Sequence, residues 1–96
     1  MRKAARTDSN QKEIVTALRN SGAVVLLTHQ LKNCCDCIVY HNGNTYTVEI
    51  KDGNLPPSAR KLTKGEQQFK EKVESVGVKY HVITSVDEAI LMIEQK

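Results

Sequence analysis

Two carboxylic acids and a lysine, Asp36, Glu49 and Lys51, stand in two short β-prone segments that are joined by Asn42 and Gly43. Asn-Gly is the strongest two-residue hairpin signal, because a type I′ turn needs positive φ at both of its central positions. Pairing the strands symmetrically about this turn places Asp36 directly opposite Glu49, with Lys51 as the diagonal neighbour of Asp36. The sequence therefore predicts that one face of one hairpin gathers all three side chains.

Two carboxylates that face each other on a sheet repel, and cross-strand pair terms of this kind are worth ~0.2–1 kcal/mol. Lys51 can neutralise one charge, one acid can stay protonated with a raised pKa, or a divalent cation can bind both acids. An exposed pair relieved by Lys51 and water would need no function. Mg²⁺ is typically held by one or two carboxylates together with waters and phosphate oxygens, so the spacing favours a site for a hard cation.

Three cysteines within four positions raise the alternative of a zinc-bound interaction domain. In the predicted hairpin, Cys35 and Cys37 share the core face with Ile50 and Val48, whereas Cys34 points the other way. Three thiolates at neighbouring strand positions cannot converge tetrahedrally, and no Cys-x-x-Cys pair is present. Small, buried, reduced cysteines are the favoured interpretation.

Two capping boxes mark the starts of helices: Thr63 is followed by Glu66, and Ser85 by Glu88. With the apolar periodicity and the Gly and Pro positions, they predict an α/β fold of order α-β-β-β-α-β-α around one mixed sheet flanked by helices. The apolar stripe of the second helix comprises Phe69, Val73 and Val76. The expected elements are a helix over 10–21, strands over 23–29, 35–41 and 44–51, a loop over 52–62, a helix from 63, a strand over 78–84 and a helix over 85–95.

The composition is that of one globular domain. We expect a basic N-terminal arm over residues 1–7 and a single domain over residues 8–96 of the 96-residue chain, which carries a net charge of +3. No apolar run approaches the roughly 20 residues that span a bilayer, and no secretory signal is recognisable, so a cytoplasmic location without a membrane is expected. Basic residues that could meet a polyanion such as DNA are Arg2, Lys3, Arg6, Arg60, Lys61 and Lys64.

The spacing Asp36, twelve residues, then Glu49-Ile50-Lys51 resembles the signature of PD-(D/E)XK nucleases. The segments "DSNQKEIV", "YTVEIKDG", "PPSARKLTKGEQQF" and "VITSVDEAI" resemble one branch, the small phage-type members of the VRR-NUC (virus-type replication-repair nuclease) family. The resemblance runs from about Arg6 to Ile93. One departure is that Cys35 stands where the family usually has a proline before the motif Asp.

This resemblance implies a restriction-endonuclease-like core whose Mg²⁺ or Mn²⁺ is bound by Asp36, Glu49 and the carbonyl of Ile50. Lys51 would orient or deprotonate the attacking water, or stabilise the charge of the transition state. Glu13 matches an acid of the family's first helix that approaches the metal; alternatively, it completes a capping interaction three residues after Asn10. Gln67 matches a glutamine near the site, and a solvated glutamine is the alternative.

The function that the resemblance implies is a metal-dependent, structure-selective endonuclease that cuts branched DNA. Like a Holliday-junction resolvase in phage DNA repair or recombination, it would leave 5′-phosphate and 3′-hydroxyl ends. A homodimer in the cytoplasm of a bacterium or a phage-infected host is expected, because an isologous dimer offers two equivalent sites to a four-way junction. A flap or nicking nuclease, or a non-catalytic DNA-binding module that keeps the fold, is the alternative.

Overall fold

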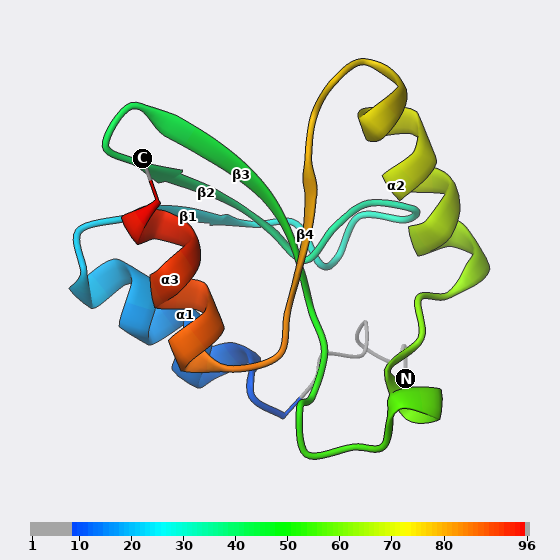
Figure 1. Cartoon of the computed structure of the whole chain (residues 1–96), viewed down its shortest axis with the longest axis horizontal. Helices are drawn as coiled ribbons and strands as arrows, with labels where there is room; N and C mark the ends of the chain where they lie inside the picture. Colours follow the sequence, from blue (N-terminus) through cyan, green and yellow to red (C-terminus); the bar gives the residue numbers. More distant parts are fainter. Residues whose placement is uncertain (1–8, 96) are drawn as a thin grey trace.

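A four-stranded mixed sheet forms the centre of the computed structural model, which describes residues 9–95 (Figure 1). The predicted arm over residues 1–7 lies outside the described residues. Strands β1 (Val24–Leu27), β2 (Cys37–His41) and β3 (Asn44–Ile50) are antiparallel neighbours, and β4 (Tyr80–Ile83) adds parallel to β3. The predicted element order and the mixed sheet are confirmed.

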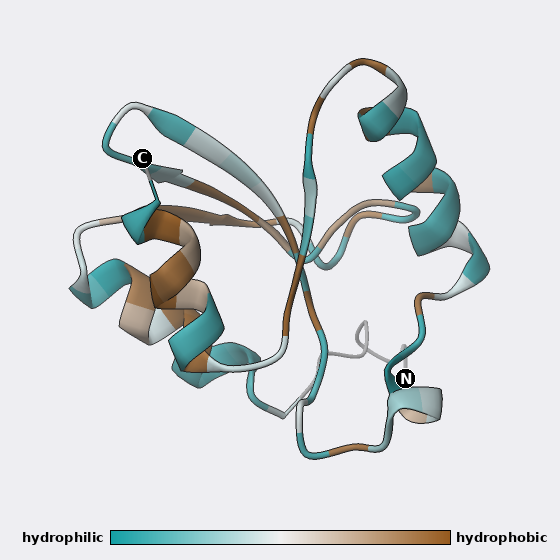
Figure 2. Cartoon of the chain, in the orientation of Figure 1, coloured by the Kyte–Doolittle hydropathy of each residue, from teal (hydrophilic) through white to brown (hydrophobic). Residues whose placement is uncertain are grey.

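Helices α1 (Gln11–Asn20) and α3 (Val86–Glu94) lie together and cover one face of the sheet (Figure 1). Their apolar sides and the facing strand residues form the core, and Figure 2 shows brown, hydrophobic segments on α3 and on the strands. This core includes Leu18, Cys37, Val48 and Met92. The period-two pattern of the hairpin therefore correctly predicts Cys37 and Val48 as core residues.

Helix α2 (Lys64–Ser75), which follows the short 3₁₀ helix η1 (Pro57–Arg60), lies apart from the other two helices (Figure 1). The predicted capping box is confirmed, because Glu66 N–H donates to Thr63 Oγ1 at 3.2 Å and Thr63 N–H donates to Glu66 Oε1 at 2.8 Å. The predicted apolar stripe does not form part of the core: no described residue of α2 is buried, and Val76 is 76% exposed. Phe69 instead packs edge to face on Tyr80.

The hairpin turn has the predicted conformation, with φ of 50° at Asn42 and 82° at Gly43. The predicted register is confirmed up to the pair Cys37 and Val48. Beyond that pair, Asp36 N–H donates to the carbonyl of the same Val48 at 3.0 Å, so two residues of one strand face one residue of the other. This is the pattern of a β-bulge. The prediction that Asp36 and Glu49 form a regular ladder pair is therefore wrong, because the ladder is interrupted just before Asp36.

The ends of β3 and β4 are fastened to the start of α1. Lys51 N–H donates to Ile83 O at 3.0 Å, which extends the pairing of the two strands by one residue. The side-chain amide of Asn10 donates to Lys51 O at 3.0 Å and to Thr84 O at 3.1 Å. Three elements that are distant in sequence thus fix the backbone that carries Lys51.

Gly53 is required at the same place, because a Cβ atom built on it would lie 2.7 Å from the backbone oxygen of Thr84. Gly53→Ala is therefore expected to push the two segments apart and lower the free energy of unfolding by about 1–3 kcal/mol. Urea denaturation monitored by circular dichroism measures this change. Asn54→Ala at the exposed neighbouring position is the control, and equal midpoints for the two variants would contradict the close approach.

No helix within residues 9–95 has both the length and the apolar character needed to cross a membrane.

Candidate active site

Asp36 occupies the bulge and is held from three directions. Its N–H donates to Val48 O, and its carbonyl accepts from Thr28 N–H at 2.8 Å. Its carboxylate oxygen Oδ2 accepts from Ile50 N–H at 2.7 Å. Bulges often re-aim a side chain beside an active site, and here the bulge turns the Asp36 carboxylate onto the end of β3. The backbone of Asp36 is therefore fixed by Thr28 and by Val48 of β3, and its carboxylate is fixed by Ile50 of β3.

Glu49 is an acid in a place where a charge is costly, because its side chain is only 2% exposed. One of its oxygens, Oε1, accepts a hydrogen bond from the Tyr80 hydroxyl at 2.9 Å. Burial, and then the nearby carboxylates of Asp36 and Glu66, raise the pKa of Glu49 to about 10. Without a cation, Glu49 is therefore protonated at neutral pH, which is one of the three solutions that the opposed acids allow.

Lys51 directly follows β3 and lies between two acids. Its Nζ is 2.8 Å from Glu66 Oε1 and 3.8 Å from Glu49 Oε2. Burial raises the pKa of Glu66, but hydrogen bonds from Lys51 and from Thr63 N–H outweigh this effect and hold the pKa below its usual value. Glu66 is thus the ionised partner of Lys51, and the predicted convergence of Glu49 and Lys51 is present.

Glu66 and Tyr80 are the two site residues that the sequence reasoning does not assign to the site. The capping box places the Glu66 carboxylate at the start of α2, but the box does not reveal that the same oxygen also accepts from Lys51. Tyr80 faces Thr47 in the parallel pairing of β4 with β3, so it lies on the same side of the sheet as Glu49. Burial and the neighbouring Glu49 raise the pKa of Tyr80, so its hydroxyl stays a donor.

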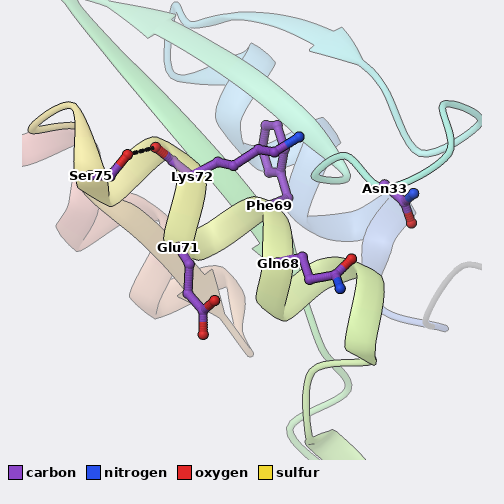
Figure 3. A pocket seen from close by; sticks show the side chains of 6 residues that line it. All are labelled: Asn33, Gln68, Phe69, Glu71, Lys72 and Ser75. Atoms are coloured by element: carbon purple, nitrogen blue, oxygen red, sulfur yellow. Dashed lines mark hydrogen bonds between the residues drawn. The ribbon is translucent and has the colours of Figure 1, made fainter.

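A hollow lies beside this cluster, between α2 and the loop before β2 (Figure 3). In Figure 3, Asn33 lies on the loop opposite α2, while Glu71 points away from the loop. Phe69 lines the hollow, and its ring centroid is 6.3 Å from that of Tyr80. Phe69 therefore connects the hollow with Tyr80, the residue that holds Glu49.

Glu13 and Gln67 have other neighbours than the carboxylate pair. Glu13 is exposed and lines a second pocket with Asn10 and Asp52. The alternative capping role is not seen either, because the Asn10 side chain makes no capping hydrogen bond at the start of α1. Gln67 is exposed and donates to Glu71 Oε2 at 3.2 Å, in agreement with a solvated glutamine.

The predicted basic residues divide into two groups. Arg60 ends η1, and Lys61 and Lys64 lie at the entrance to α2, close in sequence to the site residue Glu66. Arg2, Lys3 and Arg6 lie outside the described residues.

The thiols do not form a metal site among the described residues. Cys35 and Cys37 are buried, and burial raises their pKa values to about 11 and about 12. Across residues 9–95, no group of three or more His, Cys, Asp or Glu side chains is arranged to hold a metal ion. Neither the zinc alternative nor a three-acid set that includes Glu13 is therefore assembled.

Removing the Tyr80 hydroxyl is expected to leave Glu49 Oε1 buried without a donor. Tyr80→Phe should lower the free energy of unfolding by about 1–3 kcal/mol, the usual effect of an unsatisfied buried polar atom. Thermal unfolding without divalent metal measures the loss. Tyr40→Phe on the exposed part of β2 is the matched control, and a loss of equal size there would contradict the assignment.

Comparisons with known proteins bear on the fold. No family model and no curated protein matches the chain. A solved structure described as "VRR_NUC domain" is 19% identical, matches with a TM-score of 0.65, and the match covers 90% of this chain and 96% of that chain. The predicted fold is confirmed, and the chain has the fold of a VRR_NUC domain.

Proposed function

We propose that the chain is a metal-dependent nuclease of the VRR-NUC family. The observation that carries the proposal is the buried carboxyl of Glu49, which lies near Asp36 and beside the ammonium of Lys51. A buried acid facing a second acid costs free energy and has no evident benefit to the fold. Such perturbed groups concentrate at functional sites.

The donor set fits a hard cation. Asp36 and Glu49 would supply carboxylate oxygens and Ile50 would supply a backbone carbonyl, and oxygen ligands are those that Mg²⁺ and Mn²⁺ prefer. A bound cation would replace the proton that the raised pKa of Glu49 favours. When bound, the metal would polarise the scissile phosphate and lower the pKa of a bound water.

The other functions at the site are carried out by side chains of the protein. Lys51 supplies a positive charge and hydrogen-bond donors next to the carboxylate pair, where they can orient the attacking water or meet the phosphate charge. Glu66 fixes the Lys51 ammonium through the 2.8 Å contact, and Tyr80 fixes Glu49 through its hydroxyl. The bulge keeps Asp36 in place through the Ile50 N–H.

For the substrate we propose branched DNA, cut by a homodimer to 5′-phosphate and 3′-hydroxyl ends. The support is the resemblance of the segments around Asp36, Glu49 and Lys51, together with the basic residues at the entrance to α2. DNA backbones are bound by such residues without reading sequence. Two sites related by two-fold symmetry suit a four-way junction.

The test is a cleavage panel. A labelled four-way junction, a flap and a linear duplex are incubated with Mg²⁺, with Mn²⁺ or with EDTA, and the product ends are mapped. We expect cleavage of a branched substrate that needs the metal and disappears in Asp36→Asn. Binding without metal-dependent cleavage would support the non-catalytic module, and preference for the flap would support the flap nuclease. Analytical ultracentrifugation of the same sample tests the homodimer.

A further inference from the structure

Two neighbouring thiols lie against each other immediately before the bulge. The Sγ atoms of Cys34 and Cys35 are 3.9 Å apart. Cys34 is partly exposed, so it is open to a reagent, whereas Cys35 is buried. Cys37 is fully buried in the core among apolar side chains. The pair is therefore a dithiol with one accessible member, and the thiol of the third cysteine is enclosed in the core.

The buried member of the pair is tied to the frame of the site. The carbonyl of Cys35 accepts from Thr28 Oγ1 at 2.7 Å, and its thiol donates to Cys37 O at 3.4 Å. The next residue is Asp36, whose N–H and carboxylate are both bound to β3. A change in the conformation of Cys35 therefore acts on Asp36 through one peptide bond.

We propose that Cys34 and Cys35 form a redox modification site that a low-molecular-weight disulfide oxidises, and that oxidation displaces Asp36. The Cys34 thiol attacks the small disulfide, forms a mixed disulfide and releases one small thiol. The Cys35 thiol then attacks the Cys34 sulfur and releases the second small thiol. The protein gains one disulfide and loses two hydrogens, while the small disulfide is reduced to two thiols.

The geometry explains why oxidation would move Cys35 and why the disulfide would be readily reduced. The two sulfur atoms must close from 3.9 Å to about 2.05 Å, which draws the Cys35 thiol from its contact with Cys37 O. Adjacent Cα atoms are about 3.8 Å apart, below the roughly 4.4–6.8 Å that disulfides usually span. The resulting strain is relieved by reduction, and strained disulfides are the labile, regulatory ones.

The first test is chemical and needs no nuclease activity. The full chain is treated with glutathione disulfide, unfolded, alkylated and weighed by mass spectrometry. We expect a loss of about 2 Da before alkylation, and one alkylated cysteine instead of three after it, both reversed by dithiothreitol. Cys34→Ser should form no internal disulfide, whereas Cys37→Ala, the matched control, should form it like the parent. A stable mixed disulfide in the parent, or unchanged thiols, would overturn the proposal.

The second test measures whether the Asp36 carboxylate keeps its hydrogen bond to Ile50 N–H. Amide hydrogen exchange at Ile50, whose N–H donates to the Asp36 carboxylate, is expected to be at least about tenfold faster in the oxidised parent, with Val39 in the core as the reference. Unchanged exchange at Ile50 would overturn the displacement of Asp36.

Loss of cleavage on oxidation is the functional consequence and rests on the proposed function. If the reduced parent cleaves, the oxidised parent should be at least about tenfold slower and Cys34→Ser should be insensitive; an equally active oxidised parent would overturn the switch. If the reduced parent does not cleave, the proposed function fails. The mass measurement and hydrogen exchange still test whether Cys34 and Cys35 form a disulfide that displaces Asp36.

Discussion

Glu49→Gln is expected to abolish cleavage and, at the same time, to make the metal-free protein more stable at neutral pH. The amide keeps the shape of the carboxyl and can still accept from the Tyr80 hydroxyl, but it cannot become the anion that a cation needs. In the parent, the buried acid must carry a proton that the unfolded chain has already released at pH 7. The variant does not bear this cost.

The sign of the pH dependence follows from the raised pKa of Glu49. Between its usual pKa of 4.5 and the folded value of about 10, the folded chain binds more protons at this residue than the unfolded chain does. The contribution of Glu49 to stability is therefore present below the lower pKa and is lost as pH rises through this window, at up to about 1.4 kcal/mol per pH unit. The Glu49→Gln substitution removes this slope, because the amide does not titrate.

Urea unfolding at about pH 5, 7 and 9 without divalent metal measures the effect. The stability of Glu49→Gln relative to the parent should grow with pH, from near zero at the lowest pH to about 1–3 kcal/mol at neutral pH. Glu94→Gln, at an exposed acid near the end of α3, is the control and should run parallel to the parent. Parallel curves for Glu49→Gln as well would show that Glu49 is ionised in the folded chain.

Lys51→Met is expected to reduce the rate of cleavage by at least about 100-fold while metal binding persists. The methionine keeps the approximate length of the side chain but removes the ammonium that stands beside Glu49 and Glu66. Single-turnover cleavage and Mn²⁺ titration by calorimetry separate the two effects.

A matched control exists on α2, where Lys70 pairs with Glu74 at 2.9 Å. Lys70→Met also removes one ammonium and one ion pair, and it should cleave at the rate of the parent. Equal cleavage rates for Lys51→Met and Lys70→Met would show that Lys51 has no role in cleavage. Loss of Mn²⁺ binding in Lys51→Met would instead mean that Lys51 acts through the geometry of the metal ligands.

Local signals in the sequence predict those parts of the molecule whose causes are local. Asn42-Gly43 fixes the turn, the alternation of side chains sends Cys37 and Val48 to the core, and Thr63 with Glu66 marks the start of α2. Each of these depends on residues within a few positions of one another. The convergence of Glu49 and Lys51 follows from the same strand, because residues two apart point to the same side.

The features that local signals do not predict depend on tertiary contacts. The bulge at Asp36 arises where β1, β2 and β3 meet, and a symmetric pairing rule assumes an unbroken ladder. The capping box says where α2 begins but not which face of the sheet it approaches, so the prediction of Val76 as an apolar contact is wrong. Tyr80 reaches Glu49 only through a parallel pairing that forms across a long crossover.

Only the resemblance predicts Glu13 and Gln67 as site residues. Among the described residues, neither makes a contact with Asp36 or Glu49 that would support its predicted role. A resemblance transfers positions along a chain, whereas the approach of a helix to a sheet depends on the packing of this particular core.

One oxygen atom, Glu66 Oε1, accepts both from the backbone N–H of Thr63 and from the ammonium of Lys51. The first turn of α2 and the lysine at the end of β3 therefore share a single acceptor. If that turn unwinds or moves, the 2.8 Å contact between Lys51 and Glu66 is lost in the same event. Lys64 lies in this turn and Arg60 and Lys61 lie shortly before it, so a polyanion that displaces them would also alter the position of Lys51. Binding of a nucleic-acid backbone at these basic residues and the position of the Lys51 ammonium would then be coupled through Glu66.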